Sequence, residues 1–134
     1  MDLKETKVGS EPIYEGSFVS ISRDTVRLAN GNESKRIVIR HPGAASVLAE
    51  TENGEIVLVR QWRYAVGEAV LELPAGKLDV AGEDPAECAL RELAEETPYT
   101  ADSVKLLHTF YTAVGFCDEK CTSTKPKACV WAAP

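Results

Sequence analysis

Glu92, Glu95 and Glu96 are spaced so that they fall on one face of a helix. Like charges at this spacing repel each other, and they lie near the expected C-terminal end, where the helix macrodipole disfavours anions. A solvated acidic face is one interpretation, but such a face usually interleaves lysines, and this segment offers only Arg91. A bound cation is the other interpretation. Hard carboxylate oxygens favour magnesium, which completes its octahedron with water and phosphate oxygens.

The same segment carries the signals of an amphipathic helix. Asp84 is a good N-cap, Pro85 suits the first helical position and Glu87 can complete a capping box. Pro98 ends the helix because proline cannot continue the hydrogen-bond ladder. Apolar residues recur at helical spacing and predict one stripe that faces a core: Ala86, Ala89, Leu90 and Leu93.

Strands are predicted on both sides of this helix. Asn30-Gly31 and Asn53-Gly54 are strong two-residue turn signals between apolar segments. We expect a hairpin around each turn, a short strand before Pro74 and a strand after the helix: residues 18–28 with 36–40, 44–49 with 55–60, 70–73 and 104–111. The pattern as a whole predicts an α/β protein that begins with antiparallel strands.

Composition limits the class of protein. The 134 residues suffice for one domain with a core, and the formal net charge of -6 excludes a generally basic, nucleic-acid-coating surface. No apolar run approaches the roughly 20 residues needed to span a bilayer, and the first residues lack the apolar stretch of a secretory signal. We expect a cytoplasmic protein with no nucleic-acid or membrane partner, whose four cysteines are reduced thiols.

Read in register, these residues resemble a known signature. Gly76, Glu83 and the run Arg91-Glu92-Leu93-Ala94-Glu95-Glu96-Thr97 resemble the Nudix box of the Nudix hydrolases. Residues 59–64, 71–79 and 110–120 are similar to the ADP-ribose pyrophosphatase branch of that family, and the resemblance extends over residues 14–120.

The resemblance implies a Nudix-type α/β/α sandwich with a mixed sheet, preceded by N-terminal antiparallel strands. We therefore divide the chain into N-terminal strands at 1–40, which are a candidate dimer-exchange element, a Nudix domain at 41–120 and an aberrant tail at 121–134.

The resemblance also implies a cation site. Glu92 and Glu96 would ligate magnesium, with manganese as the alternative ion, and the backbone carbonyl of Ala75 would complete the protein's share. Glu95 would assist through water or a further ion. Arg91 would orient the glutamates through charge-assisted hydrogen bonds.

Further roles follow from matching positions. Gly76 would let the loop fold back onto the helix, and Glu83 would support the geometry of loop and helix. Arg63 resembles an arginine that contacts a diphosphate, and Glu119 resembles a carboxylate on the substrate side. Arg36 matches a position that reaches into the site of the partner subunit, which implies a homodimer.

These roles together imply hydrolysis of the pyrophosphate bond of a nucleoside diphosphate sugar, most simply ADP-ribose to AMP and ribose 5-phosphate. Two other interpretations stay open: a non-catalytic Nudix-fold module that binds a nucleotide sugar, and an inactive truncated product.

The sequence departs from the family pattern in three places. Six residues rather than five separate Gly76 from Glu83, and Pro98 takes a position usually held by glycine. After Lys120 the family pattern continues with an apolar strand, a loop bearing a catalytic glutamate, another strand and a C-terminal helix. Residues 121–127 are instead polar, and Pro126 would remove a ladder hydrogen bond, so we expect no central strand there. We interpret the chain as truncated or frameshifted after Lys120, without its last strands and C-terminal helix, and expect weak stability and poor activity.

Overall fold

The computed structural model describes residues 2–132, which form two compact units. Unit 1 comprises the residues up to Pro42 together with Tyr111–Lys120, and unit 2 comprises Gly43–Phe110 together with the residues from Cys121 onward. This division follows compactness alone, so the three segments drawn from the sequence at 1–40, 41–120 and 121–134 stay a prediction.

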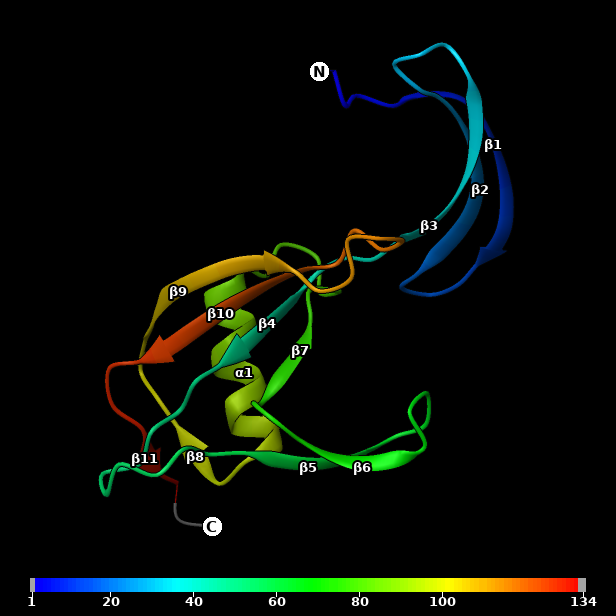
Figure 1. The fold of residues 1–134 in the computed structure, drawn as a ribbon. Helices are drawn as coiled ribbons and strands as arrows, with labels where there is room; N and C mark the ends of the chain where they lie inside the picture. The colour runs from blue at the N-terminus through cyan, green and yellow to red at the C-terminus, as the bar shows by residue number, and fades with distance from the viewer. Residues whose placement is uncertain (1, 133–134) are drawn as a thin grey trace. The chain divides into compact units, whose positions relative to one another are not determined.

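Unit 1 is built on a three-stranded antiparallel sheet. The turn at Asn30-Gly31 joins the second strand to the third, and Gly31 adopts a φ of 86°, a left-handed conformation that favours glycine. These two strands are as predicted. A third strand, which the sequence did not indicate, precedes them and pairs with the second strand. Register shifts beside Gly9 and Pro12 interrupt the alternation of its side chains, and pairing tolerates such shifts. The strands pair in the order β1 (Thr6–Glu15), β2 (Ser20–Arg27) and β3 (Glu33–Arg40) (Figure 1).

Unit 2 contains a mixed four-stranded sheet. One strand, β4, lies next to an antiparallel partner on one side and a parallel partner on the other. The order is β7 (Ala75–Lys77), β4 (Ala44–Val47), β10 (Lys120–Pro126) and β9 (Val104–Tyr111), and the short strands β8 (Tyr99–Thr100) and β11 (Val130–Trp131) pair separately. The mixed α/β fold expected from the sequence is confirmed.

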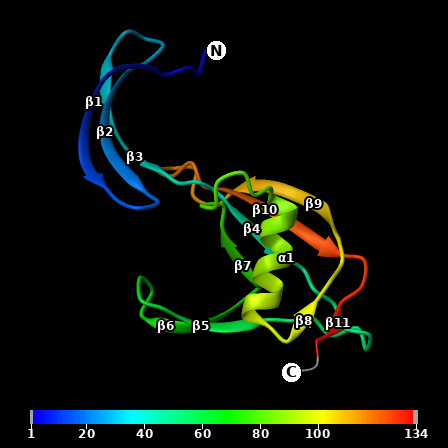
Figure 2. The same ribbon diagram turned by 180° about the vertical axis from the view of Figure 1, so that it is seen from behind.

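The helix α1 (Pro85–Glu96) covers one face of this sheet, against β4 and β7, and is seen from its two sides in Figures 1 and 2. Asp84 caps it, because its carboxylate accepts the backbone N–H groups of Ala86 and Glu87 at 2.8 and 3.0 Å. The predicted apolar stripe is anchored by Leu93, which is fully buried in the core. Among the described residues, no helix has the length and apolar character to cross a membrane.

The tail contributes a strand that the sequence argued against. β10 lies between β4 and β9, where Thr124 is 1% exposed and donates its hydroxyl to the carbonyl of Ser46 at 2.8 Å. Pro126 is the last residue of the strand. The expectation that residues 121–127 form no central strand is therefore wrong. Threonine is β-branched and suits a pleated sheet, and its hydroxyl is paired rather than left unsatisfied.

The hairpin predicted over residues 44–49 and 55–60 is reduced to one bridge, between Glu50 and Ile56. Both edges of β4 are taken by β7 and β10, so no edge is left for the following segment along that strand. β5 (Val59–Arg63) pairs instead with β6 (Glu68–Glu72). The turn is as predicted, but the pairing is shorter than expected because local turn signals do not show which long-range partner occupies a strand edge.

Replacing Thr124 by aspartate tests the buried position of β10. A carboxylate there would be enclosed without a cation, so Thr124→Asp should lose about 3 kcal/mol or more of unfolding free energy. Ala128→Asp adds the same charge at an exposed position and should change stability by less than about 0.5 kcal/mol. Urea titrations measure both, and equal midpoints would contradict the central strand. The weak stability expected from the sequence stays a prediction that the wild-type curve tests.

Candidate functional site

α1 presents its glutamates to the loop that leads from β6 into β7. The Glu92 side chain is 14% exposed and Glu96 is half-buried, whereas the Glu95 side chain is 59% exposed. Two of the three carboxylates, one turn apart on the helix, are therefore enclosed, and the third faces solvent.

A single guanidinium links most of this acidic face. Arg91 donates through Nε and Nη2 to Glu83 at 2.8 and 2.9 Å, and through Nη1 to Glu92 at 2.7 Å and to Glu95 at 3.2 Å. Hydrogen bonding to Glu83 raises the pKa of Arg91, and the same bonds lower the pKa of Glu83. The additional residue between Gly76 and Glu83 does not prevent this contact.

The backbone of β7 lies directly against the two enclosed glutamates. The Ala75 N–H donates to Glu96 Oε2 at 3.2 Å. A Cβ atom on Gly76 would lie 2.1 Å from the carboxyl carbon of Glu92, so only glycine allows this approach without a shift of the glutamate.

Cys88 of α1 contacts the backbone of the same strand. Its thiol is buried and lies 3.8 Å from the carbonyl oxygen of Gly76 and 3.6 Å from that of Lys77. Burial, reinforced by the negative charges of Glu83 and Glu92, raises the pKa of Cys88 to about 11. The group is therefore a neutral thiol at physiological pH, able to donate to these carbonyls.

The helix ends at Glu96, and Thr97 is its C-cap. Thr97 donates its backbone N–H and its hydroxyl to the carbonyl of Leu93, at 3.1 and 2.6 Å, and adopts an extended conformation. Proline favours an extended conformation in the residue before it. The chain therefore leaves the helix in an extended conformation at Thr97, without the left-handed cap that a glycine would form.

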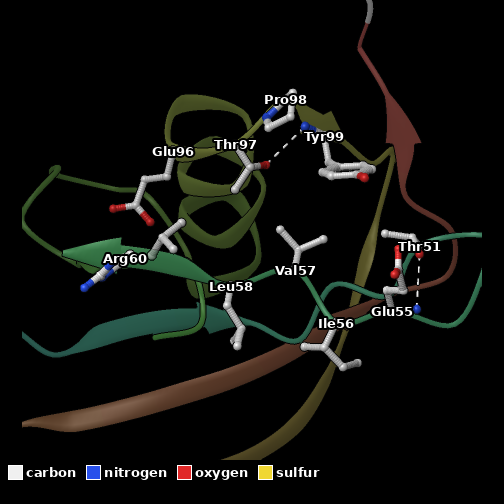
Figure 3. Close-up of a pocket in the computed structure, with 11 residues that line it drawn as sticks. Thr51, Glu55, Ile56, Val57, Leu58, Arg60, Glu96, Thr97, Pro98 and Tyr99 are labelled. Carbon is white, nitrogen blue, oxygen red and sulfur yellow. Dashed lines mark hydrogen bonds between the residues drawn. The ribbon is translucent and has the colours of Figure 1, made fainter. Parts of the chain in front are cut away.

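A cavity of about 580 Å³ adjoins Glu96. Ile56, Val57 and Leu58 form one wall and Tyr99 lies on the opposite side, with Arg60 and Glu96 at one end (Figure 3). The hydrogen bond from the Tyr99 N–H to Thr97 Oγ1, at 3.1 Å, holds the aromatic wall beside the end of the helix. The cavity thus joins an apolar wall to a charged end.

The β5–β6 hairpin carries two polar residues that sequence reasoning missed. Gln61 donates its side-chain N–H to Glu96 Oε1 at 3.1 Å. Glu72 accepts Nε of Arg63 at 2.6 Å and also pairs with its Nη2, which raises the pKa of Arg63 and lowers that of Glu72. The signal that could have found Gln61 is the alternation of β5, which places Gln61 and Arg63 on one face.

The remaining predicted residues belong to unit 1. Arg36 is paired with Glu5 through Nε and Nη2 at 3.0 and 2.6 Å. Glu119 accepts the hydroxyl of Thr112 at 2.5 Å. The structure therefore gathers the glutamates of α1, Arg91, Glu83 and residues 75–76 of β7 within unit 2, and it does not show Arg36 or Glu119 joined to them.

The donor set matches a hard divalent cation in its chemistry. Within residues 2–132 no group of three or more acidic, histidine or cysteine side chains converges as a complete cage. Magnesium does not need one, because it usually takes one or two carboxylates and keeps water or phosphate oxygens. Glu92 and Glu96 are two neighbouring carboxylates, with the backbone of β7 beside both.

Comparisons with known proteins show the family of the chain. Residues 40–128 match the NUDIX domain. The chain is 44% identical to an ADP-ribose pyrophosphatase of Bacillus subtilis over 87% of this chain and 63% of that protein. It is 45% identical to a methanol dehydrogenase activator of Bacillus methanolicus over 87% and 62% of the two chains. It is 42% identical to an ADP-ribose pyrophosphatase of Mycobacterium tuberculosis over 84% and 54%.

A crystal structure of an ADP compounds hydrolase has a similar fold, with a TM-score of 0.79, 19% identity, and coverage of 100% of this chain and 73% of that one. The fold and the acidic helix thus define an α/β domain of the Nudix type. The matched domain spans most of the chain, and the protein belongs to the NUDIX domain family. It spans 54–63% of the lengths of the three relatives named above.

The ion pair between Glu83 and Arg91 predicts a specific pH dependence. The pKa of Glu83 is lower in the folded state than the value of about 4.3 expected in the unfolded chain. Its contribution to stability is therefore complete above that value and is lost as the pH falls through the folded pKa.

Glu83→Gln should accordingly be less stable than wild type near neutral pH, and the gap in urea midpoints should narrow near pH 3 because glutamine does not titrate. Midpoints measured at both pH values test this. A gap of the same size at both would show that the charge of Glu83 does not stabilise the folded state.

Proposed function

We propose that the protein hydrolyses the pyrophosphate bond of a nucleoside diphosphate sugar, with ADP-ribose giving AMP and ribose 5-phosphate. The observation that carries the proposal is the pair of enclosed carboxylates, Glu92 and Glu96, held against the backbone of residues 75–76 in β7. The named activities of the Bacillus subtilis and Mycobacterium tuberculosis relatives support this choice of substrate.

We propose that Glu92, Glu96 and the Ala75 carbonyl hold magnesium, or alternatively manganese. The chemistry that such an ion supplies when bound is neutralisation of the diphosphate charge and activation of water for attack at phosphorus. Arg91 orients Glu92 and Glu95 by direct hydrogen bonds, and Glu83 fixes Arg91 in turn. Glu95 is solvent-exposed, which suits an assisting role through water.

Arg63 is the candidate diphosphate contact. Its Nε and Nη2 are held by Glu72, which leaves Nη1 to donate to a phosphate oxygen. The pairing restricts the guanidinium to one orientation, so less conformational entropy is lost when substrate binds. The cavity beside Glu96 is the candidate binding site for one end of the substrate. Its volume of about 580 Å³ falls in the range of small-molecule sites.

Glu96→Gln tests the proposed activity. Loss of one anionic ligand should lower the rate of AMP release from ADP-ribose with magnesium by about 100-fold or more, because the charge stabilisation at stake is several kcal/mol. Glu52→Gln removes the same charge at an exposed position and should leave the rate unchanged.

Chromatographic detection of AMP provides the measurement. An unchanged rate in Glu96→Gln would remove the assigned role of that residue. Calorimetric binding of ADP-ribose by wild type without any AMP release would replace the proposal with that of a non-catalytic nucleotide-sugar-binding module.

We further propose a homodimer formed through the N-terminal strands, in which Arg36 of β3 reaches the partner subunit's site. The sheet of unit 1 leaves Val8 at 42% and Ile37 at 46% exposure, and its described residues include no helix to cover them. Apolar side chains on an uncovered sheet favour burial against another surface.

Light scattering should therefore report the mass of two chains. Ile37→Glu should shift the mass towards one chain, because a buried interface would enclose the new charge. Asn32→Glu adds that charge in the exposed turn and should leave the dimer intact. A monomeric wild type would refute the proposed assembly without bearing on the hydrolysis.

A further inference from the structure

The three glutamates of α1 are held by different kinds of donor. Arg91 pairs with Glu92 and Glu95, whereas no ion pair of Glu96 is found among residues 2–132. Both oxygens of Glu96 accept instead from neutral groups, Oε1 from the Gln61 side chain at 3.1 Å and Oε2 from the Ala75 N–H at 3.2 Å. The orientation of this carboxylate therefore depends on one side-chain amide and one backbone amide.

The β5–β6 hairpin determines where that side-chain amide lies. Gln61 pairs with Val70 across the hairpin and is half-buried, on the face that also carries Arg63. A half-buried amide is costly to enclose unless it is hydrogen-bonded, so the bond to Glu96 stabilises both partners. The hairpin lies beside the end of α1 that carries Glu96 (Figure 1).

The neutrality of Gln61 has a chemical consequence. A lysine or arginine at this position would compensate the charge of Glu96 and compete with a divalent cation for it. An amide restrains the carboxylate without forming an ion pair with it, and Arg63, which is paired with Glu72, interacts with Glu96 only by electrostatic attraction over a longer distance.

We propose that Gln61 is a positioning residue that holds Glu96 in its cation-binding orientation, an inference that rests on the proposed function. Gln61 would act through Glu96 rather than on the substrate. Removing its N–H should loosen Glu96 and weaken binding of the cation, while the other ligand, Glu92, keeps its own partner Arg91.

Gln61→Met is the sharpest variant, because methionine keeps the length of the side chain but cannot donate. Calorimetry with Mn²⁺ alone, without nucleotide, should show an affinity about 10–100-fold below wild type, the range typical of lost ligand-orienting partners. The Mg²⁺ concentration for half-maximal AMP release should rise in parallel, with a smaller change in the rate at saturating Mg²⁺.

Leu71→Ala is the matched control, because Leu71 is an exposed residue on the other face of the same hairpin. The Mn²⁺ affinity of this variant should equal that of wild type. A purely structural role for Gln61 would lower the urea midpoint of Gln61→Met and leave its Mn²⁺ affinity unchanged, which would overturn the inference. If Gln61→Met does not fold, the urea midpoint and the Mn²⁺ affinity of Gln61→Leu test the inference instead. Loss of folding in both variants would also overturn the inference. A wild type that binds no Mn²⁺ and releases no AMP would instead refute the proposed function itself.

Discussion

The candidate site depends on how one guanidinium is shared among several carboxylates. Arg91 contacts Glu83, Glu92 and Glu95. Glu92 and Glu95 otherwise repel each other near the C-terminal end of a short helix, where the macrodipole disfavours anions. Because Glu83 comes from the loop before α1, the same ion pairs that relieve repulsion also attach the loop to the helix. The acidic face is therefore part of the local fold as well as a candidate site for a cation.

The buried residues of α1 explain why these charges stay in place. Leu93, Cys88 and Ala89 are buried in the core with residues of β4, so the helix cannot rotate without exposing apolar surface. Cys88 adds weak hydrogen bonds to β7 at Gly76 and Lys77. A twelve-residue helix that is marginal by itself is thus held both by core contacts and by ion pairs.

The tail shows how a polar segment can occupy the middle of a sheet. Thr122 and Thr124 are buried in β10, and Thr124 donates to a backbone carbonyl of the neighbouring strand. Hydrophobicity along the sequence argued against a strand there. The burial of β10 results instead from the parallel partner, β4, which lies more than seventy residues earlier in the chain.

The sequence by itself determined α1, its cap at Asp84 and the shared face of Glu92, Glu95 and Glu96, because these depend on spacings of a few residues. It also indicated Glu83 and Gly76, through a resemblance that keeps them in register with the helix. Only the tertiary structure decided that Gln61 contacts Glu96, that Glu72 holds Arg63 and that β10 lies beside β4. Those contacts join segments distant in sequence, and which segments meet depends on the competition for strand edges and core volume across the whole chain.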